Sequence, residues 1–186
     1  MKLLIRGGSI AAGYGVRRGY VDILRQALAG KGIDVINISG FQQTSFDGIE
    51  TFRGVLESVA PDILLIHFGV DDAFQYVFRS EFQENIVRMV QTARTHGVSR
   101  IFLASSQMFD DPEEMGAVGL FYRSLRIVAA DLDCGLIPVH IFWDGYLDIH
   151  GLSGKDLLLA DSRYPNERGH AVIAEAILKW LEHIRP

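Results

Sequence analysis

Cysteine is nearly absent from this sequence of 186 residues, in which Cys134 is the only one. A single thiol excludes an internal disulfide framework and any zinc site built from cysteines. Basic residues are also the minority, with 18 Lys and Arg against 23 Asp and Glu and a net charge of −5. A nucleic-acid binder needs a basic face to displace counterions from phosphates, so this balance argues against a nucleic-acid partner.

Long hydrophobic runs are missing as well. No apolar run approaches the roughly 20 residues that cross a bilayer, and the apolar opening is broken at once by Arg6, which makes it too short for a signal peptide. Hydrophobic residues nevertheless make up 48% of the chain and charged residues 22%, which is ordinary globular usage. We therefore expect a soluble, cytoplasmic protein without a membrane span, folded as a single domain over residues 1–186.

Short apolar runs alternate with longer amphipathic stretches from end to end. The expected strands are residues 3–6, 34–38, 62–68, 100–104 and 136–142. Apolar residues spaced at three and four predict helices over residues 20–28, 49–59, 82–93, 120–132 and 172–181. This alternation predicts an α/β fold, a three-layer α/β/α sandwich around a five-stranded parallel sheet in the flavodoxin-like order 2-1-3-4-5. Its site would lie at the carboxyl ends of strands one and three.

A glycine-rich turn follows the first expected strand and contains Gly7, Gly8, Ser9, Gly13 and Gly15. A phosphate-binding P-loop is excluded because a tyrosine occupies its lysine position, and the third glycine of a dinucleotide fingerprint is missing. A serine flanked by glycines at the end of a parallel strand can act as a nucleophile, with its own N–H facing a developing oxyanion. A tight turn with incidental glycines is the alternative.

Four blocks of residues stand after expected strands or in the final loop. The first two are Gly7-Gly8-Ser9 followed by Gly13, and Asn37-Ile38-Ser39-Gly40. The last two are Gly69-Val70-Asp71-Asp72, and Asp161-Ser162-Arg163-Tyr164-Pro165-Asn166 followed by Gly169-His170. In their order and positions these blocks resemble those of the SGNH (GDSL-type) hydrolases along almost the whole chain. The resemblance implies the same three-layer fold.

The resemblance also implies roles for single residues. Ser9 would attack an acyl carbonyl, Gly40 would donate to the oxyanion, and Asp161 would orient the catalytic base. Three positions depart from the family pattern: Gly8 replaces the first-block aspartate, Asp71 the oxyanion asparagine, and Tyr164 the histidine base. A tyrosine accepts a proton poorly at neutral pH, and an ionised Asp71 would repel an oxyanion unless burial kept it protonated.

Two histidines are alternatives as the base: His150 in the long stretch of residues 143–168, which is expected to be irregular, and His170 at the start of the last helix. His67 and His140 fall within the third and fifth expected strands and are expected to pack rather than react. The carboxylates of Asp71, Asp72 and Asp161 could suggest a magnesium site, because magnesium prefers oxygen ligands. The corresponding residues of the resembling family are not metal ligands, so we expect no metal and no cofactor.

The resemblance therefore implies an esterase, deacylase or acyltransferase that acts on an ester, amide or acyl group of a small substrate. Its site would comprise Ser9, Gly40, Asp71, Asp161 and Tyr164. The departures leave two alternatives. One is a catalytically degenerate member that serves as a small-molecule-binding or regulatory protein. The other is an enzyme with a changed reaction, in which Asp71 or Tyr164 is the acid–base group, because a fold does not fix a function.

Overall fold

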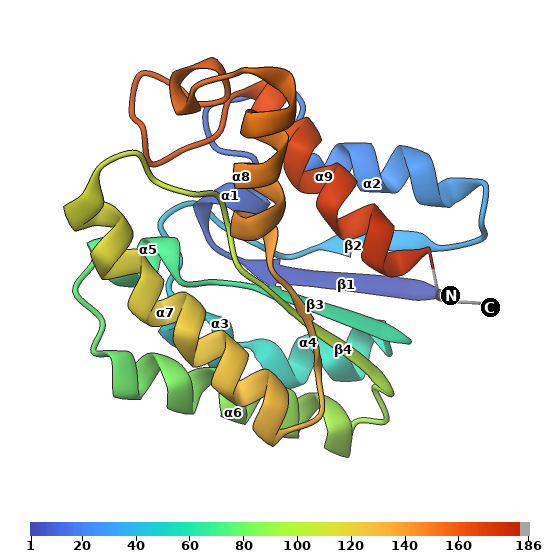
Figure 1. The fold of residues 1–186 in the computed structure, drawn as a ribbon. Helices are drawn as coiled ribbons and strands as arrows, with labels where there is room; N and C mark the ends of the chain where they lie inside the picture. The colour runs from blue at the N-terminus through green and yellow to red at the C-terminus, as the bar shows by residue number, and fades with distance from the viewer. Residues whose placement is uncertain (183–186) are drawn as a thin grey trace.

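The computed structural model describes residues 1–182, in which strands and helices alternate (Figure 1). The strands are β1 (Lys2–Gly7), β2 (Asp34–Asn37), β3 (Ile63–His67), β4 (Arg100–Ala104) and β5 (Gly135–Ile137). All pair in parallel, and the order over these residues is β2-β1-β3-β4-β5. The predicted fold class and strand order are confirmed.

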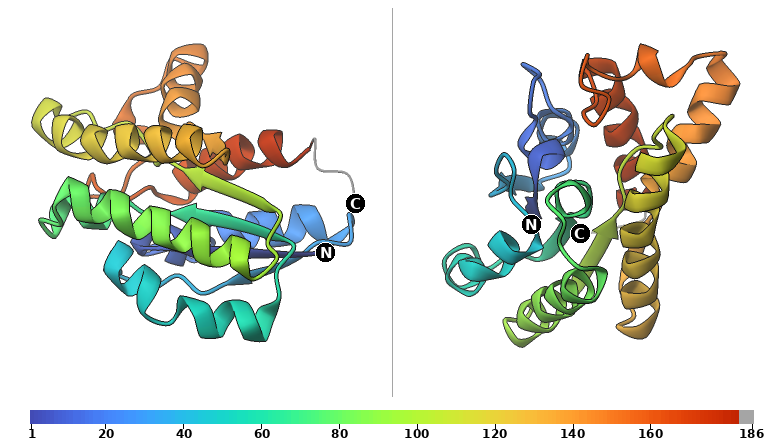
Figure 2. Two further views of the ribbon diagram at one scale, coloured as in Figure 1. Left: turned by 90° about the horizontal axis from the view of Figure 1, so that it is seen from below. Right: turned by 90° about the vertical axis from the view of Figure 1, so that its left-hand side faces the viewer.

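Helices cover both faces of the sheet (Figure 2). One face is covered by α2 (Tyr20–Ala29), α8 (Val139–His150) and α9 (Glu167–Leu181). The other face is covered by α3 (Ser45–Glu50), α4 (Phe52–Val59) and α6 (Arg79–Thr95). Helix α7 (Pro112–Asp131) contributes side chains to both cores. Side chains of a strand alternate between faces. Accordingly, Leu3 and Ile5 of β1 enter one core and Leu4 enters the other. The sheet is thus a buried middle layer.

The fifth strand is shorter than predicted. It ends at Ile137, and residues 139–142 begin α8 instead of continuing the strand. Pro138 stands at the boundary, where it has no N–H to give to a strand ladder. The prediction of a strand through residue 142 is therefore wrong, and His140 lies on a helix. The same helix fills the first part of the stretch that we expected to be irregular.

Other differences concern boundaries. The predicted helix over residues 49–59 is two helices, α3 and α4, and α7 begins at Pro112, well before the predicted residue 120. Short helices α1 (Ser9–Ala12), α5 (Val70–Phe74) and the 3-10 turn η1 (Gly154–Asp156) were not predicted. None of the helices over residues 1–182 is long and apolar enough to cross a membrane.

The register of the two central strands fixes where the site forms. Gly7, the last residue of β1, lies opposite His67, the last residue of β3. The helices α1 and α5 follow these strands within three residues. Ser9 and Asp71 are thereby brought to the same edge of the sheet, at the carboxyl ends of adjacent strands, where α/β folds place their ligand sites.

Candidate active site

Ser9 is the first residue of α1 and is fully buried. Its hydroxyl donates a hydrogen bond to Oδ1 of Asp71 over 2.7 Å, and its backbone N–H donates to Oδ2 of the same carboxylate over 2.6 Å. The backbone N–H of Gln42 donates to Ser9 Oγ over 2.9 Å. A single carboxylate therefore binds both the hydroxyl and the backbone N–H of Ser9.

Asp71 lies on α5 and is 7% exposed. Burial raises the pKa of its carboxyl above the ordinary value of 3.8, while the hydrogen bonds from Ser9 and the positive charge of Arg163 act in the opposite direction. A carboxylate whose pKa is raised is a stronger proton acceptor than one in water. Asp71 thus stands where a general base for Ser9 has to stand.

Gly8 is required by the close approach of this carboxylate. A Cβ at position 8 would lie 2.1 Å from Asp71 Oδ2 and 2.6 Å from the carbonyl oxygen of Gln43. Any side chain at position 8 therefore excludes Asp71 from its present position. Two of the departures seen in the sequence, Gly8 and Asp71, are consequently one structural change: the glycine makes the room that the carboxylate occupies.

The loop between β2 and α3 is held by Arg6, a buried residue of β1. Its guanidinium donates to the carbonyl oxygen of Ile38 over 2.7 Å, and also to the side chain of Gln43 and the carbonyl of Asp47. Burial lowers the pKa of Arg6, and the nearby Asp47 charge acts the other way. One cation thus holds two points of the loop that faces Ser9 and the first part of α3.

The same loop carries Gln42 and Gly40. Gln42 has a φ of +57°, in the left-handed region that is uncommon for a residue with a side chain. This conformation accompanies the hydrogen bond from its N–H to Ser9 Oγ. Gly40 is half-buried, and a Cβ there would lie 2.6 Å from Cδ of Gln43. The loop therefore contacts the serine through the backbone N–H of Gln42.

Tyr164 belongs to the final loop and is 7% exposed. Burial and the Asp71 carboxylate raise the pKa of its phenol, while a hydrogen bond with Ser9 and the charge of Arg163 act the other way. Its ring lies edge-on to Tyr14 at 4.7 Å, and Tyr14 stacks on Phe41 at 4.2 Å. An aromatic cluster of Tyr14, Phe41 and Tyr164 thus borders the buried serine.

The Asp161 carboxylate forms an ion pair with Arg163. Arg163 donates from Nε to Oδ1 over 2.8 Å and from Nη2 to Oδ2 over 2.6 Å, and this pairing lowers the pKa of Asp161. The Arg163 guanidinium also lies 5.7 Å from the ring centre of Tyr164 and 5.3 Å from that of Phe74. The structure therefore brings Ser9, Asp71 and Tyr164 together, and places the Asp161 carboxylate against Arg163.

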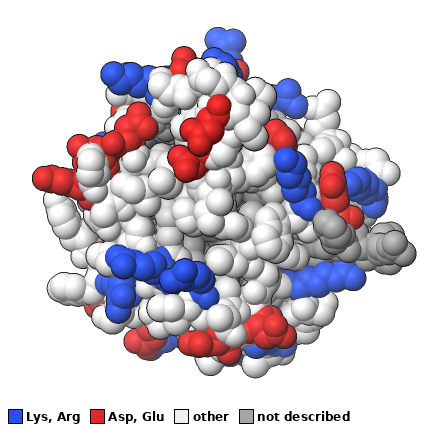
Figure 3. All heavy atoms as spheres, in the orientation of Figure 1, with Lys and Arg blue, Asp and Glu red and all other residues white. Residues whose placement is uncertain are grey.

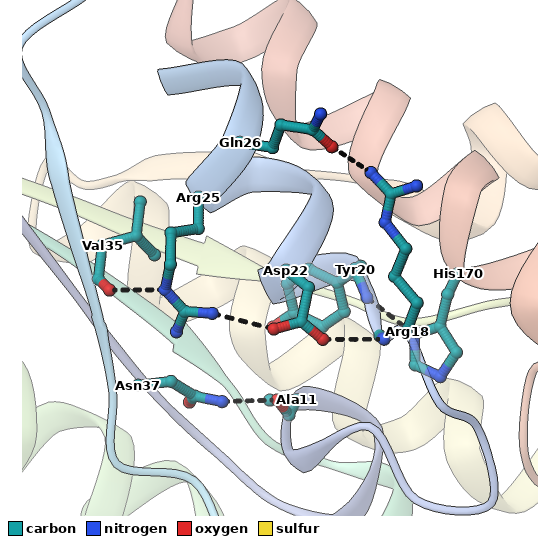
Figure 4. Close-up of polar contacts among 10 residues, drawn as sticks. Ala11, Arg18, Tyr20, Asp22, Arg25, Gln26, Val35, Asn37 and His170 are labelled. Atoms are coloured by element: carbon teal, nitrogen blue, oxygen red, sulfur yellow. Dashed lines mark hydrogen bonds and ion pairs between the residues drawn. The ribbon is translucent and has the colours of Figure 1, made fainter. Parts of the chain in front are cut away.

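The histidines lie elsewhere. His150 is exposed at the end of α8, with its ring 4.2 Å from that of Tyr146. His170 is buried on α9 and accepts the backbone N–H of Tyr20 at the start of α2 (Figure 4). His67 is buried, as predicted, and its Nδ1 lies 2.9 Å from the Tyr20 hydroxyl. Over residues 1–182, no histidine forms a hydrogen bond with Ser9, so the groups around it are a carboxylate and a phenol.

The chain is similar in sequence to a known protein family and to curated proteins. Residues 6–172 match the GDSL-like Lipase/Acylhydrolase family. The chain belongs to this family. Among curated proteins, this acylhydrolase is 29% identical to Esterase TesA of Pseudomonas aeruginosa, over 83% of this chain and 77% of the relative. It is 26% identical to Arylesterase of Vibrio mimicus, over 97% and 88%.

Solved structures show the same fold. The crystal structure of TesA superimposes on this acylhydrolase with a TM-score of 0.82 and 25% identity, covering 98% of each chain. A catalytic mutant of Axe2, an acetylxylan esterase from Geobacillus stearothermophilus, matches with a TM-score of 0.83 at 19% identity, over 96% of this chain and 92% of that one. At that identity the second likeness shows the fold alone.

Three residues around the site were not predicted from the sequence of this acylhydrolase: Arg6, Gln42 and Arg163. An arginine inside an apolar strand was a visible signal, because a buried charge needs partners. Arg163 stands inside the fourth block, beside Tyr164. Gln42 acts through its main chain, which leaves no signal in the sequence. Within residues 1–182, no group of three His, Cys, Asp or Glu side chains is arranged to hold a metal ion.

Proposed function

We propose that this acylhydrolase hydrolyses esters of small substrates, with Ser9 as the nucleophile and Asp71 as the base in place of histidine. The observation that carries this proposal is the 2.7 Å hydrogen bond from Ser9 Oγ to Asp71 Oδ1. A general base acts over about 2.6–3.2 Å. The curated relatives named above are esterases, which favours ester hydrolysis over the binding alternative.

The reaction balances with these two groups. Ser9 Oγ bonds to the acyl carbon as its proton passes to Asp71, and the tetrahedral intermediate then expels the alcohol, which takes that proton. A water molecule attacks the acyl-Ser9 ester, again losing a proton to Asp71, and the carboxylic acid leaves as Ser9 recovers its proton. Transfer of the acyl group to an alcohol instead of water would use the same acyl-Ser9. The amount of methyl ester formed in the presence of added methanol measures this transfer.

In the proposed reaction, Asp71 loses its negative charge as the oxyanion forms. An ionised carboxylate beside the carbonyl would repel a developing oxyanion. In the proposed step, however, Asp71 is protonated at the moment when negative charge forms on the carbonyl oxygen. The donors that we assign to the oxyanion are the backbone N–H of Gly40 and, once they leave Ser9 Oγ, the backbone N–H of Gln42 and the phenol of Tyr164. A raised pKa keeps the Tyr164 phenol protonated and able to donate.

Asp161 has a positioning role in this proposal. It holds the Arg163 guanidinium through two hydrogen bonds. The charge of Arg163 in turn acts on Asp71 and on Tyr164. The charge of Arg163 therefore opposes the rise that burial causes in the pKa of Asp71, and so favours the ionised carboxylate that can accept a proton.

Access to Ser9 requires a movement. Ser9 is fully buried, whereas Tyr14 and Phe41 of the aromatic cluster are 40% and 48% exposed. An ester reaches the serine only when the cluster or the loop at residues 40–43 shifts. Exposed rings at the entrance favour an apolar or aryl ester, since such a group replaces the ring contacts that are lost.

The cytoplasm remains the proposed location, because a chain with one cysteine needs no oxidising compartment.

The test is turnover of phenyl acetate together with labelling by a fluorophosphonate probe. We expect the wild-type protein to hydrolyse the ester and to be labelled, and Ser9→Ala to do neither. Ser124→Ala, which alters a buried serine of α7, is the matched control and should behave as wild type. A wild-type protein that neither reacts with the probe nor exceeds Ser9→Ala on a panel of aryl and alkyl esters would support the binding alternative instead.

A further inference from the structure

A cavity apart from Ser9 lies between α7, β5 and the start of α8. Its volume is about 170 Å³, and its walls include the apolar side chains of Leu136 and Ile141. Ser105, His140 and two arginines complete the lining. None of these residues contacts Ser9 or Asp71 through the hydrogen bonds described above. The cavity is therefore a separate feature of the fold, beside the outer strand β5 of the sheet.

The lining of this cavity includes a hydrogen-bonded serine–histidine pair. Ser105 Oγ lies 2.7 Å from Nδ1 of His140 and also accepts the backbone N–H of His140 over 3.3 Å. The serine proton is thus free to be donated to Nδ1, which leaves the ring proton on Nε2. Burial lowers the pKa of His140, which favours the neutral ring. His140, which lines the cavity, then carries an N–H donor on its ring.

Two arginines, Arg123 and Arg126, line the same cavity from α7. Both are exposed, and over residues 1–182 neither is in an ion pair with a carboxylate. Basic side chains gather over the region of α7 in Figure 3, next to uncharged surface. In a chain of net charge −5, two unpaired guanidinium groups beside an apolar hollow are a positive site that lacks its counter-charge.

We propose that this cavity is a second binding site, which takes a small organic carboxylate with an apolar part about the size of a benzene ring. An engineered cavity of about 150 Å³ takes up benzene, so the volume here suits such a group. A carboxylate only accepts hydrogen bonds, which matches the donors of Arg123, Arg126 and His140. The inference does not depend on the proposed function of Ser9.

Benzoate is the probe, titrated into the ¹⁵N-labelled protein and followed by NMR. We expect amide shifts around Ser105 and His140, saturating with a single dissociation constant, and no shifts at Ser9. Benzamide, the neutral isostere, should bind at least tenfold more weakly, and inorganic phosphate should not saturate the site in the same range. Shifts confined to Ser9 and its neighbours would mean product binding at the proposed active site and would overturn the inference.

Two pairs of variants separate charge from shape. The double variant R123Q/R126Q should weaken benzoate binding at least tenfold, whereas K31Q/R79Q, which removes two exposed charges elsewhere, should not change it. Gly119 lines the cavity, and a Cβ there meets Met115 at an ordinary 3.5 Å. Gly119→Leu should therefore fill the cavity and abolish binding, whereas Gly116→Leu, which points into open space on the same helix, should preserve it. Equal affinity in all four variants would refute the site.

Discussion

Two buried histidines should make the fold sensitive to acid. The side chains of His67 and His170 are buried, and the Nε2 atom of each has no hydrogen-bond partner within residues 1–182. Burial lowers the pKa of His67 to about 3, helped by the charge of His170, and lowers the pKa of His170 to about 4. Each ring is therefore neutral in the folded protein over the whole range where an unfolded histidine gains a proton.

The sign and size of the effect follow from linkage. Below the unfolded pKa of about 6.5, the unfolded chain binds more protons than the folded one, so the free energy of unfolding falls as pH falls. Between pH 8 and pH 5 each histidine should remove about 2 kcal/mol, or about 4 kcal/mol together. That is a large share of the roughly 5–15 kcal/mol that holds a typical domain folded. The loss continues until pH drops below the folded pKa values, near 4 and 3.

Urea unfolding at pH 8 and pH 5 measures this loss. His170→Gln should unfold with a pH dependence shallower than that of wild type by about 2 kcal/mol, whatever its stability at pH 8. Subtracting the two proteins cancels the contributions of all other groups. His150→Gln, at an exposed position of α8, is the matched control and should keep the wild-type dependence. If His170→Gln loses as much stability as wild type on acidification, the ring is protonated in the folded protein and the reasoning is wrong.

Three further predictions concern the site. Tyr164→Phe removes one of the donors that we assign to the oxyanion and should lower kcat/KM for phenyl acetate by about 10²–10³-fold, the usual cost of losing such a donor. An unchanged kcat/KM would show that the phenol does not contribute to catalysis. Gly8→Ala should lower the free energy of unfolding by about 1–3 kcal/mol through overpacking, and it should also reduce turnover. Wild-type values in urea unfolding and in turnover would disprove the close approach of Asp71 to Gly8. The kcat/KM should rise with pH through a pKa above 3.8, since the base is the ionised Asp71; a fall over that range would contradict this role.

Much of the fold could be predicted because its strands are short apolar runs and its helices have regular apolar faces. The exception is instructive: residues 136–142 form one apolar run, yet the strand ends at Ile137 and a helix begins at Val139. A short buried strand and the start of a buried helix have the same composition. Only the missing N–H of Pro138 marked the boundary, and the length of the apolar run concealed it.

The proximity of Ser9, Asp71 and Tyr164 could be predicted from the sequence, but their individual contacts could not. The blocks placed Ser9, Asp71 and Tyr164 at one edge of the sheet, where the structure has them. The double hydrogen bond from Ser9 to Asp71 could not be foreseen, because it depends on the space left at Gly8 by a missing Cβ. The pairing of Asp161 with Arg163 likewise depends on how a loop turns, which spacing along the chain does not specify.

The central claim is that Asp71 takes the proton of Ser9. Asparagine at position 71 would restore the family's oxyanion donor while removing this base. Two accounts of the site therefore predict opposite changes: activity rises if Asp71 only hinders the oxyanion, and falls if Asp71 is the base.

The deciding measurement is kcat/KM for phenyl acetate in wild type, Asp71→Asn, Tyr164→His and the double variant, with Ser9→Ala as the blank. We predict a loss of about 10²–10⁴-fold in Asp71→Asn, and a recovery in the double variant, where an imidazole replaces the lost base. Asp71→Asn activity equal to or above wild type would contradict the account.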